Sequence, residues 1–333
     1  MLRLGVIGYG YWGPNIVRNF LAHHDCNVVT ICDKSSKALT RAMAAHPGTG
    51  VTTDPDAVLL ATDIDAVAIV TPVSYHYELA KRALENGKHV FVEKPFTATS
   101  AEAEDLIELA DRRGLQIMVD HTFLFTGTVR KIKQLIDEGT LGRLYYYDST
   151  RVNLGLFQHD VNVLWDLAPH DLSIMDYLIG AEPELVVATG GAHVNNLENI
   201  AYLTVYFPDN VLAHVNVNWL SPVKVRTTLV GGQKRMLVWN DLDMAEKLRV
   251  YDKGADIKSE SGVHAALVSY RTGDMYAPKI DEAEALKMET RYFLDCVMNG
   301  TKPINDGLAG LRVVRILEAA ERSLNQHKEI VLA

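Results

Sequence analysis

Short apolar runs alternate with helical patterns over the first 120 residues of the chain. This alternation is typical of βαβ units built on a parallel sheet. One run, Ala66–Val70, is apolar throughout, as expected for a strand buried on both faces. Thr99 and Glu102 form a capping box that opens a helix, which Gly114 ends. The other elements predicted in this region are the strands Leu2–Ile7, Val28–Cys32, His89–Val92 and Gln116–Val119, and the helices Asn15–His23, Lys37–Ala45 and Tyr75–Asn86.

After Asp120 the pattern changes to longer strand-like runs with weak alternation and few helices between them. This pattern predicts an open, mostly antiparallel sheet with flanking helices. We therefore expect a doubly wound parallel α/β domain over residues 1–120 and an α+β domain over residues 121–333, with the last helices able to pack back on the first domain. The predicted elements are the strands Leu144–Val152, Leu185–Thr189, Ala201–Phe207, Leu212–Trp219, Lys224–Gly231 and Arg235–Trp239, and the helices Val129–Glu138, Ala283–Met298 and Gly307–Gln326.

The composition excludes several classes of protein. With 333 residues, 48% apolar and 23% charged, the chain is neither disordered nor collagen-like. A formal net charge of −9 offers no basic surface for nucleic acid or an anionic membrane. The three cysteines have no metal or redox spacing, the N-terminus shows no signal peptide, and no apolar run is long enough to span a bilayer. These features predict a cytoplasmic protein with neither nucleic-acid nor membrane partners.

The strongest local motif is a glycine-rich turn directly after the first predicted strand. Gly8, Gly10 and Gly13 have the G-x-G-x-x-G spacing that gives a tight turn, lets a pyrophosphate approach the backbone, and packs helix on strand. Asp33 follows 20 residues after Gly13, where a carboxylate accepts bonds from the adenosine ribose. Since that carboxylate repels a 2′-phosphate, the sequence predicts NAD rather than NADP, with Lys34 as the opposing signal.

A first catalytic candidate follows the predicted strand His89–Val92. Glu93, Lys94 and Pro95 lie at the carboxyl end of that strand, the edge at which open α/β sheets bind ligands. A lysine there can lie beside a nicotinamide, with its pKa lowered by burial and by the positive ring. The structural alternative for Lys94 is an ordinary surface charge.

A second candidate pair lies in the other half of the chain. Asp166 and His170 are four residues apart, so on a helix both side chains share one face. A carboxylate beside an imidazole orients it and raises its pKa, which suits acid–base work on an alcohol. Pro169 is then expected near a helix start. The alternative is a structural hydrogen bond, and no further ligands are spaced for a metal site.

Taken together, these motifs resemble the Gfo/Idh/MocA oxidoreductase family, which includes glucose–fructose oxidoreductase and inositol dehydrogenase. The order and spacing match over nearly the whole chain, through the glycine turn, Thr71-Pro72 with His76, Glu93-Lys94-Pro95, Asp166 with His170, and Asp306-Gly307-Leu308. The resemblance implies an N-terminal Rossmann domain for dinucleotide binding. It implies a second domain for substrate binding, whose open sheet packs against another subunit in a homodimer or homotetramer.

The same resemblance implies roles for individual residues. Lys94 and His170 are expected at the reacting carbinol, with Asp166 also on the substrate. Besides the three glycines, Asp33 and Lys34, the residues expected to bind the cofactor are Tyr11 and Trp12 at the pyrophosphate, Thr71, Pro72 and His76 on the nicotinamide ribose side, and Glu93 with Lys94. Asp120 and His121 stand where many relatives have an Asn-Arg sequence after the sixth strand, and we assign His121 to the substrate site.

The segment from Arg151 to Asn162 resembles members of the family that act on nucleotide-linked amino sugars. Arg151, Asn153, Gln158 and Asn162 give it a polar, partly cationic character, and a diphosphate needs cations and amide donors. Arg151 is the candidate for the diphosphate, because a guanidinium binds phosphate oxygens in a bidentate fork. The alternative for Arg151 is a structural ion pair with Asp160 or Asp166.

The function that we predict is oxidation of a sugar ring hydroxyl with NAD, at C3 of a UDP-linked N-acetylhexosamine such as UDP-N-acetylglucosamine. Lys94 or His170 removes the hydroxyl proton, and the sequence leaves open which of the two is the base. Two alternatives within the family are a dehydrogenase of free polyols or inositol and a reductase of 3-keto sugar nucleotides. An alternative of another class is a non-catalytic NAD(H)-binding sensor, against which the presence of both Lys94 and His170 argues.

Overall fold

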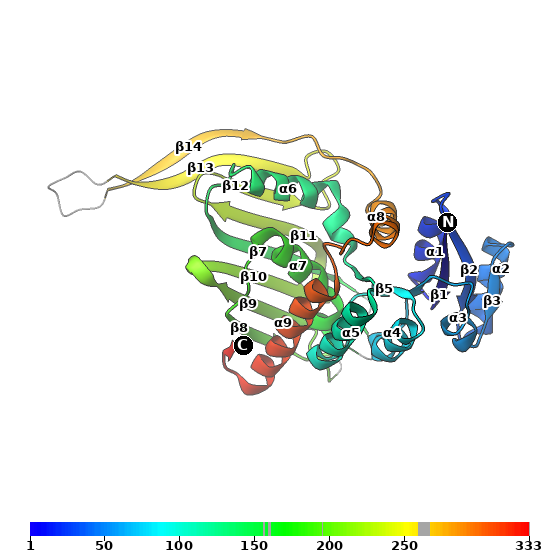
Figure 1. The fold of residues 1–333 in the computed structure, drawn as a ribbon. Helices are drawn as coiled ribbons and strands as arrows, with labels where there is room; N and C mark the ends of the chain where they lie inside the picture. The colour runs from blue at the N-terminus through cyan, green and yellow to red at the C-terminus, as the bar shows by residue number, and fades with distance from the viewer. Residues whose placement is uncertain (156, 159–160, 195, 259–266, 333) are drawn as a thin grey trace. The chain divides into compact units, whose positions relative to one another are not determined.

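The computed structural model describes residues 1–332 apart from 156, 159–160, 195 and 259–266, and Figure 1 draws its ribbon. The described chain divides into two compact units. Unit 1 consists of Met1–Phe125 and Ala283–Arg315, and unit 2 consists of Thr126–Glu282 and Ile316–Ala333. Each unit is therefore assembled from two separate stretches of sequence, whereas the sequence predicts one boundary near residue 120, with the last helices able to pack back on the first domain.

Unit 1 is built on a six-stranded sheet with the order β3-β2-β1-β4-β5-β6, and every neighbouring pair is parallel. This confirms the doubly wound parallel sheet that the sequence predicts. The strand order reverses between β1 and β4, and in such sheets ligands bind at the carboxyl edge beside this reversal. The strands are β1 (Leu2–Ile7), β2 (Cys26–Cys32), β3 (Gly50–Thr52), β4 (Ala66–Ile69), β5 (His89–Glu93) and β6 (Ile117–Asp120).

The helices of unit 1 include one from the far end of the sequence. Phe293 of α8 makes edge-on ring contacts with Phe20 of α1 and Phe91 of β5, at centroid distances of 6.0 and 5.5 Å. All three rings are fully buried, so this aromatic cluster joins α8 to the parallel sheet. The helices are α1 (Gly13–Leu21), α2 (Ser36–Ala45), α3 (Asp56–Leu59), α4 (His76–Glu85), α5 (Ser100–Arg113), α8 (Ala285–Asn299) and the part of α9 (Gly307–Gln326) up to Arg315.

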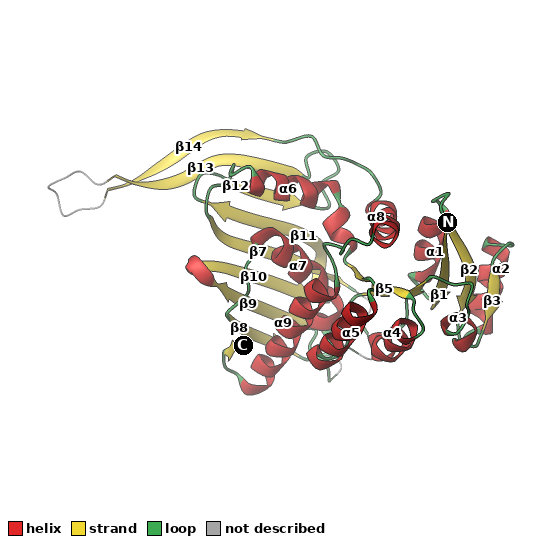
Figure 2. Ribbon diagram, in the orientation of Figure 1, coloured by secondary structure: helices red, strands yellow, loops and turns green. Residues whose placement is uncertain are grey.

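Unit 2 is built on a nine-stranded sheet with the order β14-β13-β12-β11-β7-β10-β9-β8-β15, drawn in yellow in Figure 2. Its neighbouring pairs are antiparallel except β7 and β10, which are parallel. The prediction of a mostly antiparallel sheet is confirmed. The strands are β7 (Leu144–Leu154), β8 (Leu185–Gly191), β9 (Ile200–Phe207), β10 (Val211–Asn218), β11 (Leu220–Gly232), β12 (Met236–Asn240), β13 (Leu248–Lys258), β14 (Leu267–Tyr276) and β15 (Ile330–Val331).

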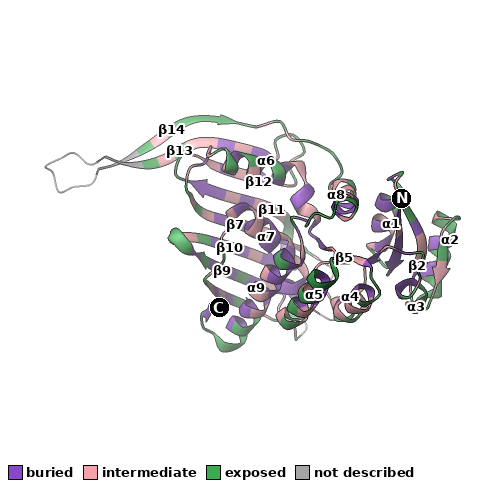
Figure 3. Cartoon of the chain, viewed as in Figure 1, coloured by how far each residue is buried: buried purple, intermediate pink, exposed green. Residues whose placement is uncertain are grey.

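One face of this sheet forms the core of unit 2. Helix α7 (Val163–Ile179) packs against β7, β9 and β10 and itself contacts α6 (Gly127–Asp137). Leu203 and Val205 of β9 are fully buried, whereas the alternating Tyr202 and Tyr206 are more than 40% exposed. Figure 3 shows the same alternation of buried and exposed positions along the strands. The two-residue period thus separates a helix-covered face from an accessible one.

Helix α7 corrects one expectation about Pro169. The Asn162 side chain accepts a hydrogen bond from the Trp165 N–H at 3.2 Å and so caps the helix, which begins at Val163. Pro169 consequently lies inside the helix, in its second turn, rather than near its start. Asp166 and His170 are both on α7, so the predicted four-residue spacing on one helix is confirmed.

The hydrophobic pattern did not predict four of the observed elements, β3, α3, β13 and β14. β3 and α3 are only 3 and 4 residues long, too short to show a period. β13 and β14 carry many charged and small residues, so their composition resembles a loop. None of the helices in the described part of the chain is long and apolar enough to cross a bilayer.

Candidate functional site

The glycine turn between β1 and α1 has the geometry that its spacing predicts. Gly8 has a φ of +104°, and a Cβ there would lie 2.1 Å from the Val70 carbonyl oxygen. A Cβ on Gly13 would lie 2.5 Å from the Gly8 carbonyl oxygen, so this position needs glycine for close packing. A Cβ on Gly10, by contrast, would meet no described atom within 4 Å. The first and third glycines are thus required by the turn itself, and the second leaves open space beside the backbone.

The start of α1 is suited to an anion. Trp12 occupies the N-cap position, and within the described residues no side chain caps this helix end. The first turn of α1 carries no acidic residue, and Pro14 stands at its start. Uncapped N–H groups and the positive end of the helix dipole favour a phosphate here. The open space at Gly10 and this helix end together fit the pyrophosphate of a dinucleotide.

Asp33 lies directly after β2, at the same carboxyl edge. Its carboxylate accepts hydrogen bonds from the Tyr9 N–H at 2.6 Å and from the Ser35 N–H at 2.7 Å. These bonds fix the carboxylate beside the glycine turn. The Lys34 ammonium lies 4.4 Å from the centre of the Tyr75 ring, a cation–π contact that occupies this side chain.

Thr71 and His76 follow β4 and differ in what they face. The His76 ring is fully buried, with Nδ1 2.9 Å from the Pro95 carbonyl oxygen and Nε2 2.7 Å from the Thr71 carbonyl oxygen. Burial lowers the pKa of this imidazole. His76 therefore joins the loops after β4 and β5. The Thr71 hydroxyl is buried without a hydrogen-bond partner among the described residues, while Pro72 is exposed.

Lys94 and His121 follow neighbouring strands at matching positions. Glu93 of β5 pairs with Asp120 of β6 in the parallel sheet. Lys94 and His121, the residues that follow them, therefore leave the sheet side by side at its carboxyl edge. Lys94 is half-buried and is joined to Pro95 by a cis peptide bond. His121 is 1% exposed, and both of its ring nitrogens lack a partner in the described structure. Burial and the charge of Lys94 lower the pKa of His121 to about 3, so its imidazole is neutral at working pH.

Trp12 is connected to the end of β6 by a contact that the sequence did not reveal. The indole Nε1–H donates a hydrogen bond to Asp120 Oδ2 at 3.2 Å. Asp120 is 2% exposed and also accepts a hydrogen bond from the Thr122 hydroxyl. Tyr11, the other aromatic residue of the turn, is 93% exposed. The position of Asp120 at a strand end was the available signal, but its partner, 108 residues away, was not predictable.

In unit 2, Asp166 and His170 project from the first half of α7. The Asp166 carboxylate accepts a hydrogen bond from Trp219 Nε1 at 3.1 Å, and Trp219 is 1% exposed. A buried indole therefore fixes the orientation of this carboxylate. Asp166 and His170 are themselves half-buried, which leaves part of each side chain accessible. Within the described residues, no group of His, Cys, Asp and Glu side chains has the arrangement to hold a metal ion.

Arg151 is engaged in the interior of unit 2. Its guanidinium donates to the Asp171 carboxylate, at 2.5 Å from Nε and 3.3 Å from Nη2. The two side chains are 6% and 4% exposed. Arg151 is thus buried on the face of the sheet that α7 covers, and its partner on α7 is Asp171 rather than Asp166. Asp160, the other partner considered, lies outside the described residues.

Of the remaining polar residues of this segment, Asn162 is buried and Asn153 and Gln158 are partly accessible. Besides capping α7, Asn162 donates from Nδ2 to Glu198 at 3.0 Å and is 5% exposed, so it has a structural role. Asn153 and Gln158 are half-buried, and either side chain retains accessible surface. Residues 156, 159 and 160 of the same segment lie outside the description.

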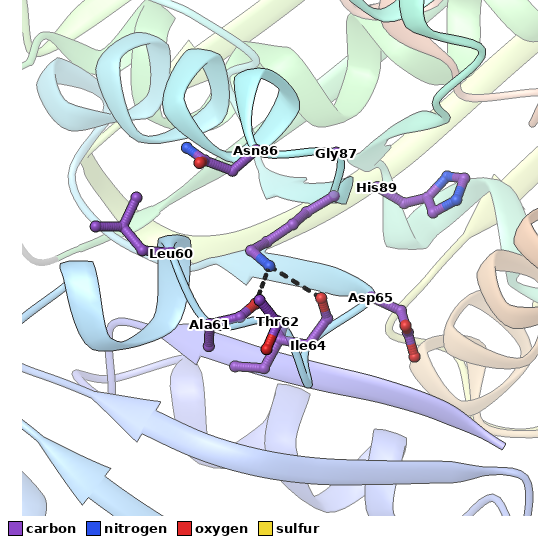
Figure 4. A pocket seen from close by; sticks show the side chains of 9 residues that line it. Leu60, Ala61, Thr62, Ile64, Asp65, Asn86, Gly87 and His89 are labelled. Carbon is purple, nitrogen blue, oxygen red and sulfur yellow. Dashed lines mark hydrogen bonds between the residues drawn. The ribbon is translucent and has the colours of Figure 1, made fainter.

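A cavity of about 450 Å³ in unit 1 has a different location (Figure 4). It lies before β4 and β5, at their amino ends, whereas the glycine turn and Lys94 are at carboxyl ends. Lys88 is 3% exposed there, and its ammonium donates to the carbonyl oxygens of Ala61 at 2.5 Å and Ile64 at 2.9 Å. Burial lowers the pKa of Lys88, and these bonds give it a structural role.

Comparison with protein families gives matches to both halves of the chain. Residues 2–121 match a model described as an oxidoreductase family with an NAD-binding Rossmann fold, GFO_IDH_MocA. Residues 129–238 match the GFO/IDH/MocA C-terminal domain. The Rossmann match agrees with the glycine turn, the uncapped helix and Asp33, and it establishes NAD as the cofactor of unit 1.

Individual relatives span the whole chain at modest identity. UDP-N-acetylglucosamine 3-dehydrogenase from Acidithiobacillus ferrooxidans is 28% identical over 317 residues, covering 94% of each chain. A solved structure of UDP-N-acetylglucosamine 3-dehydrogenase from the same organism has a TM-score of 0.81 at 25% identity, with 98% of each chain covered. Inositol 2-dehydrogenase from Rhizobium meliloti is 23% identical, covering 100% of this chain and 99% of its own.

Proposed function

The chain belongs to the GFO/IDH/MocA oxidoreductase family, and on that premise we propose that it oxidises a ring hydroxyl of a sugar. When bound, NAD supplies the hydride acceptor. The proposed substrate is a UDP-linked N-acetylhexosamine, oxidised at C3. The observation that carries this proposal is Lys94 at the carboxyl edge of an NAD-binding sheet, where the protein needs a group that handles a proton.

In this proposal the acid–base work belongs to Lys94 and His170, and Asp166 binds the substrate. Lys94 or His170 accepts the proton of the reacting hydroxyl, and the other stabilises the developing negative charge on the same oxygen. Asp166, which Trp219 Nε1 orients, binds a neighbouring hydroxyl of the sugar. A positioned base of this kind raises the rate by about 10²–10⁴-fold.

His121 has a different role because its pKa of about 3 excludes it as a base at neutral pH. A neutral imidazole offers one N–H donor and one acceptor. Both nitrogens lack partners within the described chain, and a buried polar atom of that kind costs about 1–3 kcal/mol. We assign these nitrogens to the bound substrate, whose hydroxyls can donate and accept.

The nucleotide-sugar assignment rests on the relative from Acidithiobacillus ferrooxidans and on the accessible amides of Asn153 and Gln158. Arg151 contributes to a diphosphate site only if its ion pair with Asp171 opens. The two amides are therefore the better candidates for contacts with the nucleotide part of the substrate.

A substrate screen with the purified protein tests this proposal. NADH formation is followed by absorbance with UDP-N-acetylglucosamine, free N-acetylglucosamine and myo-inositol, and kcat/KM is compared. We expect the nucleotide sugar to be preferred, because remote binding energy holds C3 in the reactive position. A free sugar or polyol with an equal kcat/KM would refute the nucleotide-sugar assignment.

A second candidate is a dehydrogenase of free inositol or a related polyol. The full-length alignment with the inositol 2-dehydrogenase from Rhizobium meliloti favours it. The same screen separates the two, since only this candidate turns over myo-inositol efficiently. The reverse reaction is tested with 3-keto sugar nucleotides and NADH. A protein that binds NAD but turns over no compound in either direction would instead be a non-catalytic sensor.

We also propose that two copies of the chain associate through the accessible face of the nine-stranded sheet. Tyr202, Tyr206 and Leu212 are each about 40% exposed on neighbouring strands of this face. Large exposed apolar and aromatic groups of this kind mark interaction surfaces. Light scattering is expected to give a dimer or tetramer for the unaltered protein and a smaller species for Leu212→Glu. A monomeric unaltered protein would overturn this proposal.

A further inference from the structure

Two carboxyl groups meet in the interior of unit 1, and the proposed reaction uses neither. Glu289 of α8 is fully buried, and Asp120 at the end of β6 is 2% exposed. Asn305 Nδ2 donates to the Val119 carbonyl oxygen at 2.7 Å and to Glu289 Oε1 at 3.1 Å, which places the Glu289 carboxyl group beside the residue after Val119, Asp120. Burial, followed by the neighbouring Asp120, raises the pKa of Glu289 well above its ordinary range and outweighs the opposite effect of the Thr122 hydroxyl.

Asp120 accepts hydrogen bonds through both of its carboxyl oxygens, whereas Glu289 accepts through only one within the described chain. Asp120 accepts from Trp12 Nε1 through Oδ2 and from the Thr122 hydroxyl through Oδ1, so both of its oxygens are acceptors. Glu289 accepts from Asn305 Nδ2 at 3.1 Å through Oε1. Its Oε2 is buried and meets no donor among the described residues. A proton on this oxygen would satisfy it, because Glu289 could then donate to Asp120.

We propose that Glu289 is a positioning residue for the NAD-binding turn. Its protonated carboxyl group donates a hydrogen bond to the Asp120 carboxylate. Asp120, oriented in this way, accepts the indole N–H of Trp12, the residue immediately before Gly13. Helix α8 thereby fixes the end of the glycine turn, where α1 begins. This inference rests on NAD binding by unit 1 and is independent of which sugar is oxidised.

Other contacts dock α8 independently of this pair. His23 Nε2 lies 3.0 Å from the Thr290 hydroxyl, and Arg291 Nη1 donates to Asp25 at 2.7 Å. Together with the Phe293 ring cluster, these contacts hold α8 against α1. We therefore expect variants of Glu289 to change the cofactor turn without detaching the helix.

The protonation of Glu289 is tested directly by infrared spectroscopy of the cofactor-free protein at pH 8. We expect a carboxylic-acid carbonyl band in the unaltered protein that is missing from Glu289→Gln. No such difference band means that Glu289 is ionised, and the proposal is then wrong. Asp295→Asn on the same helix is the matched control, since this half-exposed acid pairs with Arg291 and is expected to leave the band unchanged.

The positioning role is tested by the Kd for NAD, measured by calorimetry. Glu289→Met removes the donor, and Trp12→Phe removes the indole N–H. Each is expected to raise the Kd about tenfold, the scale of losing a hydrogen bond to a charged group. The double variant is expected to be no weaker than Trp12→Phe alone, because both act through Asp120. If the double variant instead raises the Kd by the product of the two single increases, the two residues act independently and the proposal is wrong.

Two further variants separate positioning from folding. Glu289→Gln retains a donor toward Asp120 and is expected to keep the Kd within about twofold of the unaltered protein. A tenfold weaker NAD affinity in this variant would contradict the proposal, even if Glu289→Met fails to fold. Thr290→Val, next on α8, is expected to lower the midpoint of thermal unfolding while leaving the Kd for NAD unchanged.

Discussion

The glycine turn of unit 1 and the β7–α7 region of unit 2 both concentrate polar groups, but they use them differently. Around the turn, the Thr71 hydroxyl and the His121 nitrogens are buried without partners in the described chain. In the β7–α7 region, Arg151 is paired with Asp171, and Asn162 caps a helix. The first region leaves these buried polar groups without protein partners among the described residues, which supports the proposed ligand site, whereas the second uses most of its polar groups to stabilise its own fold.

The largest effects expected from this comparison concern catalysis. Lys94→Ala and His170→Ala should each lower kcat by about 10²–10⁴-fold, because each removes an acid–base group, while the Kd for NAD changes little. Asp166→Asn should cost less, since the amide keeps an oxygen that can accept from Trp219. Steady-state kinetics on the substrate found by the screen measure this. Near-normal turnover of the Lys94 and His170 variants would refute the assignment.

The Arg151–Asp171 pair should behave as a structural element. Arg151→Ala leaves a buried carboxylate uncompensated and should lower the free energy of unfolding by about 3–5 kcal/mol. Arg151→Met combined with Asp171→Leu should recover most of this loss, as measured by urea denaturation. The matched control is Arg249→Met, whose ion pair with Asp243 at 2.8 Å is more exposed, at 32% and 22%. If Arg151→Ala keeps full stability and only raises KM for a UDP-sugar, Arg151 is a ligand residue after all.

His121 should make the stability of the unliganded protein depend on pH. Its pKa is about 3 in the folded chain against an ordinary 6.5, so the unfolded state takes up the proton first as the pH falls. Stability is complete above pH 6.5 and declines below it, by about 2 kcal/mol at pH 5. His121→Asn should remove this slope, while the other buried histidines contribute equally to both proteins. Equal pH slopes in urea denaturation would contradict the buried, neutral state of His121.

The smallest expected effect concerns cofactor choice at Asp33. Asp33→Ser should weaken NAD binding about tenfold and reduce the discrimination against NADP, because the ribose loses its carboxylate acceptor. Calorimetric titration with both dinucleotides measures the change. Tighter binding of NADP than NAD by the unaltered protein would show that Lys34 dominates, despite its contact with the Tyr75 ring.

The local chemistry of unit 1 was largely readable from the sequence. Glycine spacing, a strand before the turn and a helix after it depend on neighbouring residues only. The capping box at Thr99 also forms as predicted, because its donors and acceptors lie within one helical turn. Lys94 and His121 were placed at strand ends, and parallel pairing brings such ends to one edge.

The ends of the parallel strands, the starts of most helices and the presence of a dinucleotide turn followed from local patterns of residues. The hydrogen-bond partners of the polar side chains did not follow from these patterns. Arg151 meets Asp171, Asp166 meets Trp219, and Trp12 meets Asp120 across separations of 20, 53 and 108 residues. The physical reason is that periodicity and capping act over a few residues, whereas a hydrogen-bond partner is selected by the packing of distant elements, which no local pattern encodes.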